Sequence, residues 1–319
     1  MERNIDFVVP MVFPKNKEWR REYDKYHGDN AMKNVRYRSW GTEELQVRCV
    51  MKFMPWVRRI YILLARESQV QPWMEELAVA QQDTQPEVMV VFHREFMPER
   101  LLPCFASPCI EMFLKDIPGL SEQFIYANDD MFPLSPLEPS DFFRPAGKPT
   151  GTVAAVAQQH AQLLPCQHIT DRAYPTNPNT FQRKCMWQQN IIGKPFGRQY
   201  TKTYPDTGHV FSAILKSSCE EVWKRHGEEI TKHLSPLKRN DHSANNWIYL
   251  LYQQYSGQYV DHQPPTHYTD HTTMTCQLAE IIRDPQAGIV CLNDNENIYD
   301  WKLRAMIARE EIKKKLRAI

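Results

Sequence analysis

Four short apolar runs near the start of the chain constrain its fold more than any other feature. They have the length and β-branched content of buried strands and lie at 5–12, 59–64, 88–92 and 124–127. Helical patterns separate them: one covers 42–54 and stops at Pro55, and another covers 107–117 and stops at Pro118-Gly119. Strands and helices that alternate at this spacing predict parallel strands with right-handed crossovers. The sequence therefore predicts an α/β fold.

Weaker patterns predict the remaining elements. Pro10 indicates that the first strand is an edge strand or ends early. Ser217-x-x-Glu220 reads as a capping box that opens a helix to about residue 230. The segment 158–208 is rich in Gln, Pro and Thr, which predicts loops with one short helix near Trp187. Further strands are expected at 152–157 and 288–292, and further helices at 245–255 and 299–319.

Composition restricts the class of protein. The hydrophobic fraction of 42% and the charged fraction of 24% are those of ordinary globular proteins. With 39 basic and 38 acidic residues, the chain gives no electrostatic reason to expect nucleic-acid binding. Eight cysteines without a Cys-x-x-Cys pair indicate reduced thiols. The first apolar run is too short for a signal peptide, and no window has the length of a membrane-spanning helix, so we expect a cytoplasmic protein.

Two adjacent carboxylates follow the fourth apolar run directly, in the stretch FIYANDDMF. Ligands of parallel α/β sheets bind at the carboxyl ends of strands, which is where Asp129 and Asp130 are expected. Because two neighbouring carboxylates repel each other, a structural role for the pair needs a compensating cation. Mg²⁺ prefers one or two carboxylates together with substrate phosphates. The plainer alternative is a polar turn, since Asn and Asp favour turns.

The residues around this acidic pair resemble the second conserved region of the Stealth family. The resemblance is dense from Arg36 to Phe143 and is carried by RYRSWGTEEL, MPWVRRIYILLA, QPWM, FASPCIEMFLKDIPGLSEQFIYANDDMF and PSDFF. A looser third region matches GHVFSAILKSSCEEVWKRH and LKRNDHS, and a short fourth region matches IVCLNDNENI. Stealth proteins are sugar-1-phosphate transferases of microbial capsule and exopolysaccharide synthesis. They are related to the catalytic core of the lysosomal-enzyme GlcNAc-1-phosphotransferase.

The resemblance implies a fold and a reaction. The fold is a glycosyltransferase-A-like α/β core with a mainly parallel sheet flanked by helices, plus a helical C-terminal part. A single catalytic domain over 1–319 is expected, in which 1–157 binds the nucleotide sugar and the loop-rich, helical 158–319 completes the site. The reaction moves a hexose 1-phosphate from a UDP-sugar, such as UDP-GlcNAc, to a hydroxyl of a glycan or lipid-linked glycan. It forms a phosphodiester and releases UMP.

The resemblance also implies roles for individual residues. His209 matches a third-region histidine and is expected to act as general base, or to bind phosphate if protonated. Arg239 is expected to clamp phosphate oxygens with its fork of donors. The expected ligands of Mg²⁺ or Mn²⁺ are Asp129, Asp130 and Asp294. Asp130 is also expected to be catalytic, together with His209 and Arg239. The expected substrate-binding residues are Asn128, Arg48, Arg38, His93 and Ser107.

Several of these residues have a plainer interpretation. Arg48 reads equally well as an exposed or ion-paired helix residue, and His93 as a cap at a strand end. Ser107 is first of all a helix N-cap followed by Pro108 at the first helical position. Glu111, which lies close to this turn, is as well explained as a solvated charge. The residue types alone therefore leave these assignments open.

The chain departs from the family in its first region. Relatives usually end the first strand in a Trp-Val-Asp-Gly-like motif, whereas this chain has Met-Val-Phe-Pro at 11–14 and lacks the acid. Ser39, Gly41 and Thr42 stand where relatives tend to carry acids. A catalytically degenerate scaffold is therefore one alternative. A metal-dependent glycosyltransferase that releases UDP is another, because a metal on a diphosphate stabilises either leaving group.

Two further features allow other interpretations. His262, His267 and His271 contain a pair four residues apart, which would face one zinc ion on a helix, but Pro264-Pro265 favours a polar loop. The basic C-terminal helix has an apolar set and enough Lys and Arg for peripheral contact with an anionic membrane. Packing on the core is the favoured interpretation for that helix. The apolar set consists of Leu303, Met306, Ile307, Ile312 and Leu316.

Overall fold

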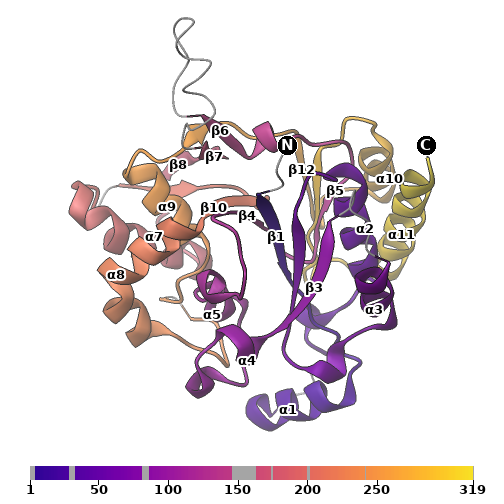
Figure 1. Cartoon of the computed structure of the whole chain (residues 1–319), viewed down its shortest axis with the longest axis horizontal. Helices are drawn as coiled ribbons and strands as arrows, with labels where there is room; N and C mark the ends of the chain where they lie inside the picture. The colour runs from indigo at the N-terminus through magenta and orange to yellow at the C-terminus, as the bar shows by residue number, and fades with distance from the viewer. Residues whose placement is uncertain are drawn as a thin grey trace, which may run out of the picture.

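A five-stranded sheet forms the centre of the molecule, with strand order β10-β4-β1-β2-β3 (Figure 1). The computed structural model describes residues 4–28, 33–80, 86–145, 163–173, 175–199, 202–240 and 242–318. The strand expected at 152–157 lies outside these residues. The central strands are β1 (Ile5–Pro10), β2 (Arg59–Leu64), β3 (Glu87–Phe92), β4 (Gln123–Tyr126) and β10 (Ser212–Leu215).

The sheet is mainly parallel. Strand β1 pairs in parallel with β2 and β4, and β2 pairs in parallel with β3. Only β10, among the described strands of this sheet, runs antiparallel, alongside β4. The carboxyl ends of four strands therefore lie along one edge, which confirms the expected α/β fold. The connections contain α1 (Lys17–His27), α2 (Glu43–Phe53), α3 (Pro72–Val79), α4 (His93–Phe96) and α5 (Ser107–Glu111).

Strand β1 lies inside the sheet, not at its edge. It pairs on both sides, and Pro10 is its last residue, where a missing N–H costs no ladder hydrogen bond. Of the two interpretations of Pro10, the early end is confirmed and the edge position is wrong. Consecutive residues 7–9 are all fully buried because helices cover both faces of a parallel sheet.

Helices cover the two faces of the sheet (Figure 1). On one face, α2 and α3 pack Val47, Val50 and Met74 against the strands. On the other, α5, α8 and α9 surround Phe124 and Tyr126 of β4. Strand β10 and helices α8 and α9 come from the second half of the chain, so both halves share one core. The ranges are α7 (Thr180–Gly193), α8 (Lys216–His233) and α9 (Trp247–Tyr255).

A smaller sheet, of order β12-β13-β5, continues directly from the acidic pair. Strand β5 (Met131–Pro133) begins at the residue after Asp130 and pairs with β13 (Ile289–Leu292), which pairs with β12 (Thr266–Thr269). Helices α10 and α11 pack behind this sheet and against α2. They are α10 (Thr275–Arg283) and α11 (Trp301–Arg317). The other short strands are β6 (Phe143–Pro145), β7 (Leu163–Gln167), β8 (Thr170–Ala173), β9 (Thr203–Asp206) and β11 (Val260–Asp261).

Three local expectations are wrong. The short helix near Trp187 is the fourteen-residue α7. The Ser217 capping box does not form, because α8 starts earlier and the Ser217 hydroxyl bonds the carboxylate of Glu122. The N-cap of α5 is Ala106, so Ser107 lies in the first turn and its hydroxyl is left for another partner.

Helix α11 packs on the core through part of its length. Ala305, Ala308 and Ile312 are buried, whereas Leu303 and Met306 of the expected apolar set are about half exposed. None of the described helices is long and apolar enough to cross a membrane. Contact of α11 with a membrane surface stays a prediction.

Candidate active site

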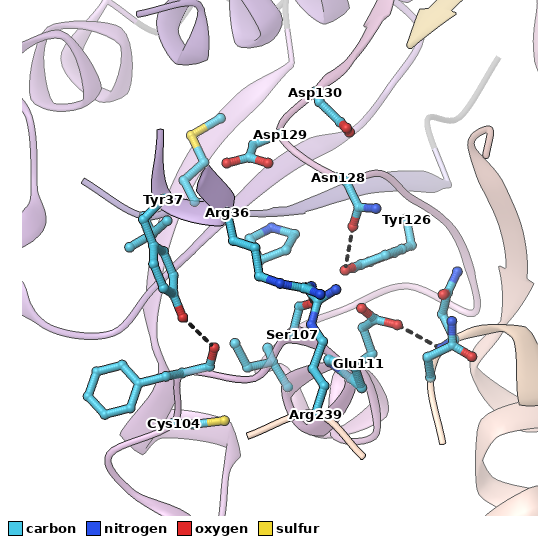
Figure 2. A pocket seen from close by; sticks show the side chains of 18 of the residues that line it. Arg36, Tyr37, Cys104, Ser107, Glu111, Tyr126, Asn128, Asp129, Asp130 and Arg239 are labelled. Carbon is cyan, nitrogen blue, oxygen red and sulfur yellow. Dashed lines mark hydrogen bonds between the residues drawn. The ribbon is translucent and has the colours of Figure 1, made fainter. Parts of the chain in front are cut away.

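A cavity of about 650 Å³ lies at the carboxyl edge of the central sheet. Its floor is made by the residues that follow β1, β2, β3 and β4, as expected for a ligand site in a parallel sheet. Helices α5 and α7 and the loop after α8 contribute another wall. Figure 2 shows three of its residues, Ser107, Glu111 and Arg239, on the far side of Asn128 from the acidic pair. The polar residues of the lining include Arg36, Gln69, His93, Ser107, Glu111, Asn128, Asp129, Asp130, Lys184, His209, Lys238, Arg239 and Asp294.

The acidic pair is held in the short connection between β4 and β5. Ala127 N–H donates to the Val8 carbonyl at 3.0 Å, which extends the β4 ladder up to the turn. Gln46 of α2 donates through Nε2 to the carbonyl oxygens of Asn128 and Met131, both at 2.6 Å. A buried helix side chain thus fixes the backbone on both sides of the two carboxylates.

The two carboxylates have different electrostatic environments. Burial, and then the charge of Asp130, raise the pKa of Asp129 to about 7. Burial acts in the same direction on Asp130, but the charge of His209 outweighs it and holds the pKa of Asp130 below its ordinary value. Figure 2 shows the two side chains next to each other above Asn128. The protein therefore compensates the charge of Asp130 more fully than that of Asp129, for which burial and the like charge outweigh the favourable effect of Arg239.

His209 reaches this site because of strand pairing. Strand β10 runs antiparallel to β4 with Ser212 opposite Tyr126, so the loop that precedes β10 meets the loop that follows β4. His209 Nε2 lies 3.5 Å from Asp130 Oδ1 and 3.4 Å from Asn128 Nδ2. Burial acts to lower the pKa of His209, but the Asp130 carboxylate outweighs it and raises that pKa. Asn128 is fixed in turn by the Tyr126 hydroxyl, which donates to its Oδ1 at 3.1 Å.

The donor set fits a hard divalent cation. Within the described ranges, Asp130 Oδ1 is buried and has no hydrogen-bond partner, and the charge of the neighbouring Asp129 is disfavoured by burial and by Asp130. Ligand atoms of Asp130, His209 and Cys291 also lie within 4.8 Å of one another. Burial raises the pKa of the Cys291 thiol well above its ordinary value, so that residue is a poor ligand at neutral pH. The two carboxylates, which are oxygen donors, suit Mg²⁺ or Mn²⁺ better.

Cationic side chains face the acidic pair. Arg36, in the short helix Val35–Tyr37, and Arg239, in the loop after α8, reach toward one another (Figure 2). Arg239 donates to the Ser107 hydroxyl at 2.6 Å. Burial, followed by the charge of Arg239, lowers the pKa of Arg36, and burial lowers the pKa of Lys184 on α7. Cations gathered in this way favour an anionic ligand.

Glu111 belongs to this wall. It is buried rather than solvated, and its carboxylate accepts from the Asn246 N–H at 2.8 Å. Its charge acts to raise the pKa of Lys184, against the effect of burial. The interpretation of Glu111 as a solvated charge is wrong.

Arg38 and Asp294 pair with each other. Arg38 Nε donates to Asp294 Oδ2 at 2.6 Å, and Trp40 Nε1 donates to the same oxygen at 3.0 Å. A second guanidinium nitrogen of Arg38 contacts Asp294 Oδ1. Asp294 lines the cavity, but both of its carboxylate oxygens are engaged. Arg38 itself lies outside the lining, where it stacks over Trp301.

Arg48 also lies outside the cavity lining. It pairs with Glu44 one turn earlier on α2, with Nε and Oε1 2.7 Å apart and both side chains about 40% exposed. This geometry matches the plainer interpretation of Arg48 as an ion-paired helix residue. His93 and Ser107, by contrast, line the cavity together with the acidic pair.

The residues missed by the sequence analysis are Arg36, Gln69 and Lys184. Arg36 opens the RYRSWG stretch, in which the sequence analysis assigns substrate binding to Arg38 instead. Lys184 lies in the polar segment 158–208, for which the sequence predicts mainly loops. The zinc alternative for His262, His267 and His271 finds no support in the described part of the chain, because His267 lies on β12 and His262 bonds toward Asp141.

Comparisons with known proteins show what this chain is similar to. The family model for Stealth protein CR2, conserved region 2, matches residues 36–150. Receptor polysaccharide phosphotransferase WefC of Streptococcus gordonii is 28% identical over 94% of this chain and 93% of its own length. Capsular polysaccharide phosphotransferase fcs1 of Haemophilus influenzae is 31% identical over 76% of this chain and 62% of its own length. Among solved structures, glycosyltransferase GlyE of Streptococcus pneumoniae TIGR4 aligns over 98% of this chain, which spans 64% of that chain, at 11% identity and a TM-score of 0.40.

Proposed function

Because this chain belongs to the Stealth family and is a phosphotransferase like its relatives, we propose that it is a sugar-1-phosphate transferase. It moves a hexose 1-phosphate from a UDP-sugar, such as UDP-GlcNAc, to a hydroxyl of a glycan or lipid-linked glycan. The acceptor oxygen bonds to the phosphorus that carries the sugar, and the bond from that phosphorus to the bridging oxygen of the diphosphate breaks. UMP leaves and a phosphodiester forms. The product belongs to capsular or exopolysaccharide synthesis.

One observation carries the proposal. The lining of one cavity at the carboxyl edge of the sheet combines the two adjacent carboxylates with the cationic side chains of Arg36, Lys184, Lys238 and Arg239. Phosphoryl transfer depends mainly on positioning and on neutralising charge, and this arrangement supplies both. A neutral sugar alone would need neither set of charges.

The acidic side of the cavity fits the metal. Asp129 and Asp130 are the residues that would hold Mg²⁺ or Mn²⁺, and the ion supplies charge neutralisation at the diphosphate when it is bound. Asp294 was expected as a third ligand. Its pairing with Arg38 and Trp40 supports a positioning role instead, in which it orders the chain next to the site.

The cationic side binds the phosphates. The guanidinium groups of Arg36 and Arg239 offer forked donors to phosphate oxygens, and the Ser107 hydroxyl holds Arg239 in place. Lys184 adds a point charge from α7. Buried positions strengthen these interactions because water screens them less.

His209 is the residue proposed to take the proton of the acceptor hydroxyl. Its raised pKa is set by the Asp130 carboxylate, so compensating that carboxylate lowers the pKa and frees Nε2 to accept a proton. Asn128 lies on the same side and orients the imidazole.

The proposal is tested by neutralising each carboxylate. Asp129→Asn and Asp130→Asn should each reduce turnover of UDP-sugar by at least about 100-fold, because a metal-supported phosphoryl transfer loses several kcal/mol without its anchor. The matched control is Asp116→Asn, an exposed aspartate outside the cavity, which should keep full activity. Full activity in both site variants would refute the proposal, and an inactive wild type with every donor would favour a degenerate scaffold.

A further inference from the structure

Gln69 has a buried amide that the fold itself does not use. It ends the short helix Glu67–Gln69 after β2, lines the cavity and is 0% exposed. Among the described residues, neither Nε2 nor Oε1 of Gln69 has a hydrogen-bond partner. Buried amides are almost always bonded, because an unpaired one is costly. An unpaired amide in the wall of a ligand cavity therefore points to a ligand as its partner.

His93 gives a second observation of the same kind. It is the first residue after β3, is almost fully buried, and lines the same cavity. Its Nδ1 has no hydrogen-bond partner within the described ranges. Burial, aided by the charge of Arg66, lowers the pKa of His93 to about 4, so the ring is neutral at pH 7. A neutral imidazole offers one donor and one acceptor to a ligand.

The strand order places these two residues away from the reacting phosphates. The acidic pair follows β4, whereas Gln69 and His93 follow β2 and β3, two and three strands along the sheet. Neighbouring strands lie about 4.8 Å apart, so this end of the cavity is roughly 10–15 Å from the acidic pair. Apolar side chains line the cavity there, namely Val12, Trp19 and Ala65. This end of the cavity is therefore lined by both apolar side chains and polar groups.

We propose that Gln69 and His93 bind the base of the donor nucleotide and read the polar edge of uracil. This inference rests on the proposed function, which puts the diphosphate between the acidic pair and the cationic wall. The nucleoside then extends along the cavity toward β2 and β3. The Gln69 amide presents a donor and an acceptor side by side, which match the O4 acceptor and the N3–H donor of uracil. A site built to bond a polar edge rejects ligands that lack it.

Calorimetric titration tests the inference with two probes, UDP and inorganic pyrophosphate, each with Mg²⁺. Gln69→Leu should weaken UDP binding by about 10- to 100-fold, the usual effect of losing one paired hydrogen-bond contact to a base edge. Pyrophosphate, which has no base, should bind the variant as it binds the wild type. The control Gln286→Leu changes an exposed glutamine outside the cavity lining and should leave both titrations unchanged.

Melting curves show whether the variant is folded. Without ligand, Gln69→Leu should melt at the same temperature as the wild type or higher, because an unpaired buried amide has been removed. His93→Leu, which removes the second polar group, should reproduce the selective loss of UDP binding.

The outcomes separate the two proposals. Unchanged UDP affinity in Gln69→Leu, or an equal loss for UDP and pyrophosphate, overturns the base-binding role while the proposed function stands. If wild-type protein binds pyrophosphate as tightly as UDP, the base contributes no affinity. That result also overturns the base-binding role while the proposed function stands. Wild-type protein that binds neither probe overturns the proposed function, and with it this inference.

Discussion

Asp129 and Asp130 are neighbours in the chain but differ in how their charge is compensated. His209 holds the pKa of Asp130 down, whereas burial and the charge of Asp130 outweigh the opposite effect of Arg239 and raise the pKa of Asp129 to about 7. Strained electrostatics of this kind are typical of functional sites, where a ligand supplies what the protein leaves out. The acidic pair is therefore the place where the proposed divalent cation would bind.

This imbalance predicts how stability depends on pH. The folded-state pKa of Asp129, about 7, lies above its unfolded value, so the folded state binds more protons between the two values. Stability that Asp129 contributes at low pH is lost as the pH rises toward 7. Melting curves without metal should show wild type falling relative to Asp129→Asn between about pH 4 and pH 7, which are the unfolded-state and folded-state pKa values, and levelling off above that range. Parallel curves for the two proteins would contradict the raised pKa.

The sequence predicted part of the site and missed the rest for physical reasons. Asp129, Asp130 and Asn128 follow a buried strand, so their place at the sheet edge could be inferred from the strand alone. Arg38 and Asp294 were assigned to the ligand because a sequence does not show that two residues 256 positions apart pair with each other. The roles of individual residues in catalysis stay predictions.

At the scale of elements, helix α2 supports the acidic turn. Its buried Gln46 donates to the carbonyls of Asn128 and Met131, which flank the two carboxylates. Arg48, two residues later, faces outward and pairs with Glu44. The helix therefore supports the site through an amide from its buried face, whereas the sequence analysis expects it to contribute Arg48 to substrate binding.

Replacing that amide tests the supporting role. Gln46→Leu should destabilise the protein by about 1–2 kcal/mol, because two donated hydrogen bonds are lost and removal of the unpaired Oε1 offsets part of the cost. It should also weaken Mg²⁺ binding, since the carboxylates lose their fixed backbone. Urea denaturation and metal titration measure the two effects. Loss of stability with unchanged metal affinity would show that Gln46 supports only the fold.

Elements with buried apolar runs were predicted well, and polar ones poorly. Strands β2 and β13 match their expected ranges to within one residue, because a central strand needs a continuous apolar run. Strand β12 was expected as part of a His-rich loop. It forms because pairing with β13 and burial of Thr269 fix it, and neither is visible in local sequence. Helix α7 is longer than the sequence predicts, because its tertiary packing is likewise not visible in local sequence.

At the scale of the whole molecule, distant parts of the chain meet at one sheet edge. The Leu292 N–H donates to the Asp130 carbonyl at 2.8 Å, so β13 brings the fourth Stealth-like region to the acidic turn. Strand β10 brings His209 from the third. The first-region acid that relatives carry after β1 is absent here, and Met11 and Val12 line the cavity at that point. Under the proposed function, the acidic pair after β4 must therefore support catalysis without the first-region acid.

The proposed function places the reaction at phosphorus and not at the anomeric carbon of the sugar. Phosphorus NMR of the reaction products distinguishes the two. The protein is incubated with Mg²⁺, a UDP-sugar and a glycan acceptor, and mass spectrometry identifies the product. The account predicts UMP together with a new phosphodiester signal, and neither should form with Asp130→Asn. Release of UDP and a glycosidic product without phosphorus would contradict it and would make the protein a glycosyltransferase.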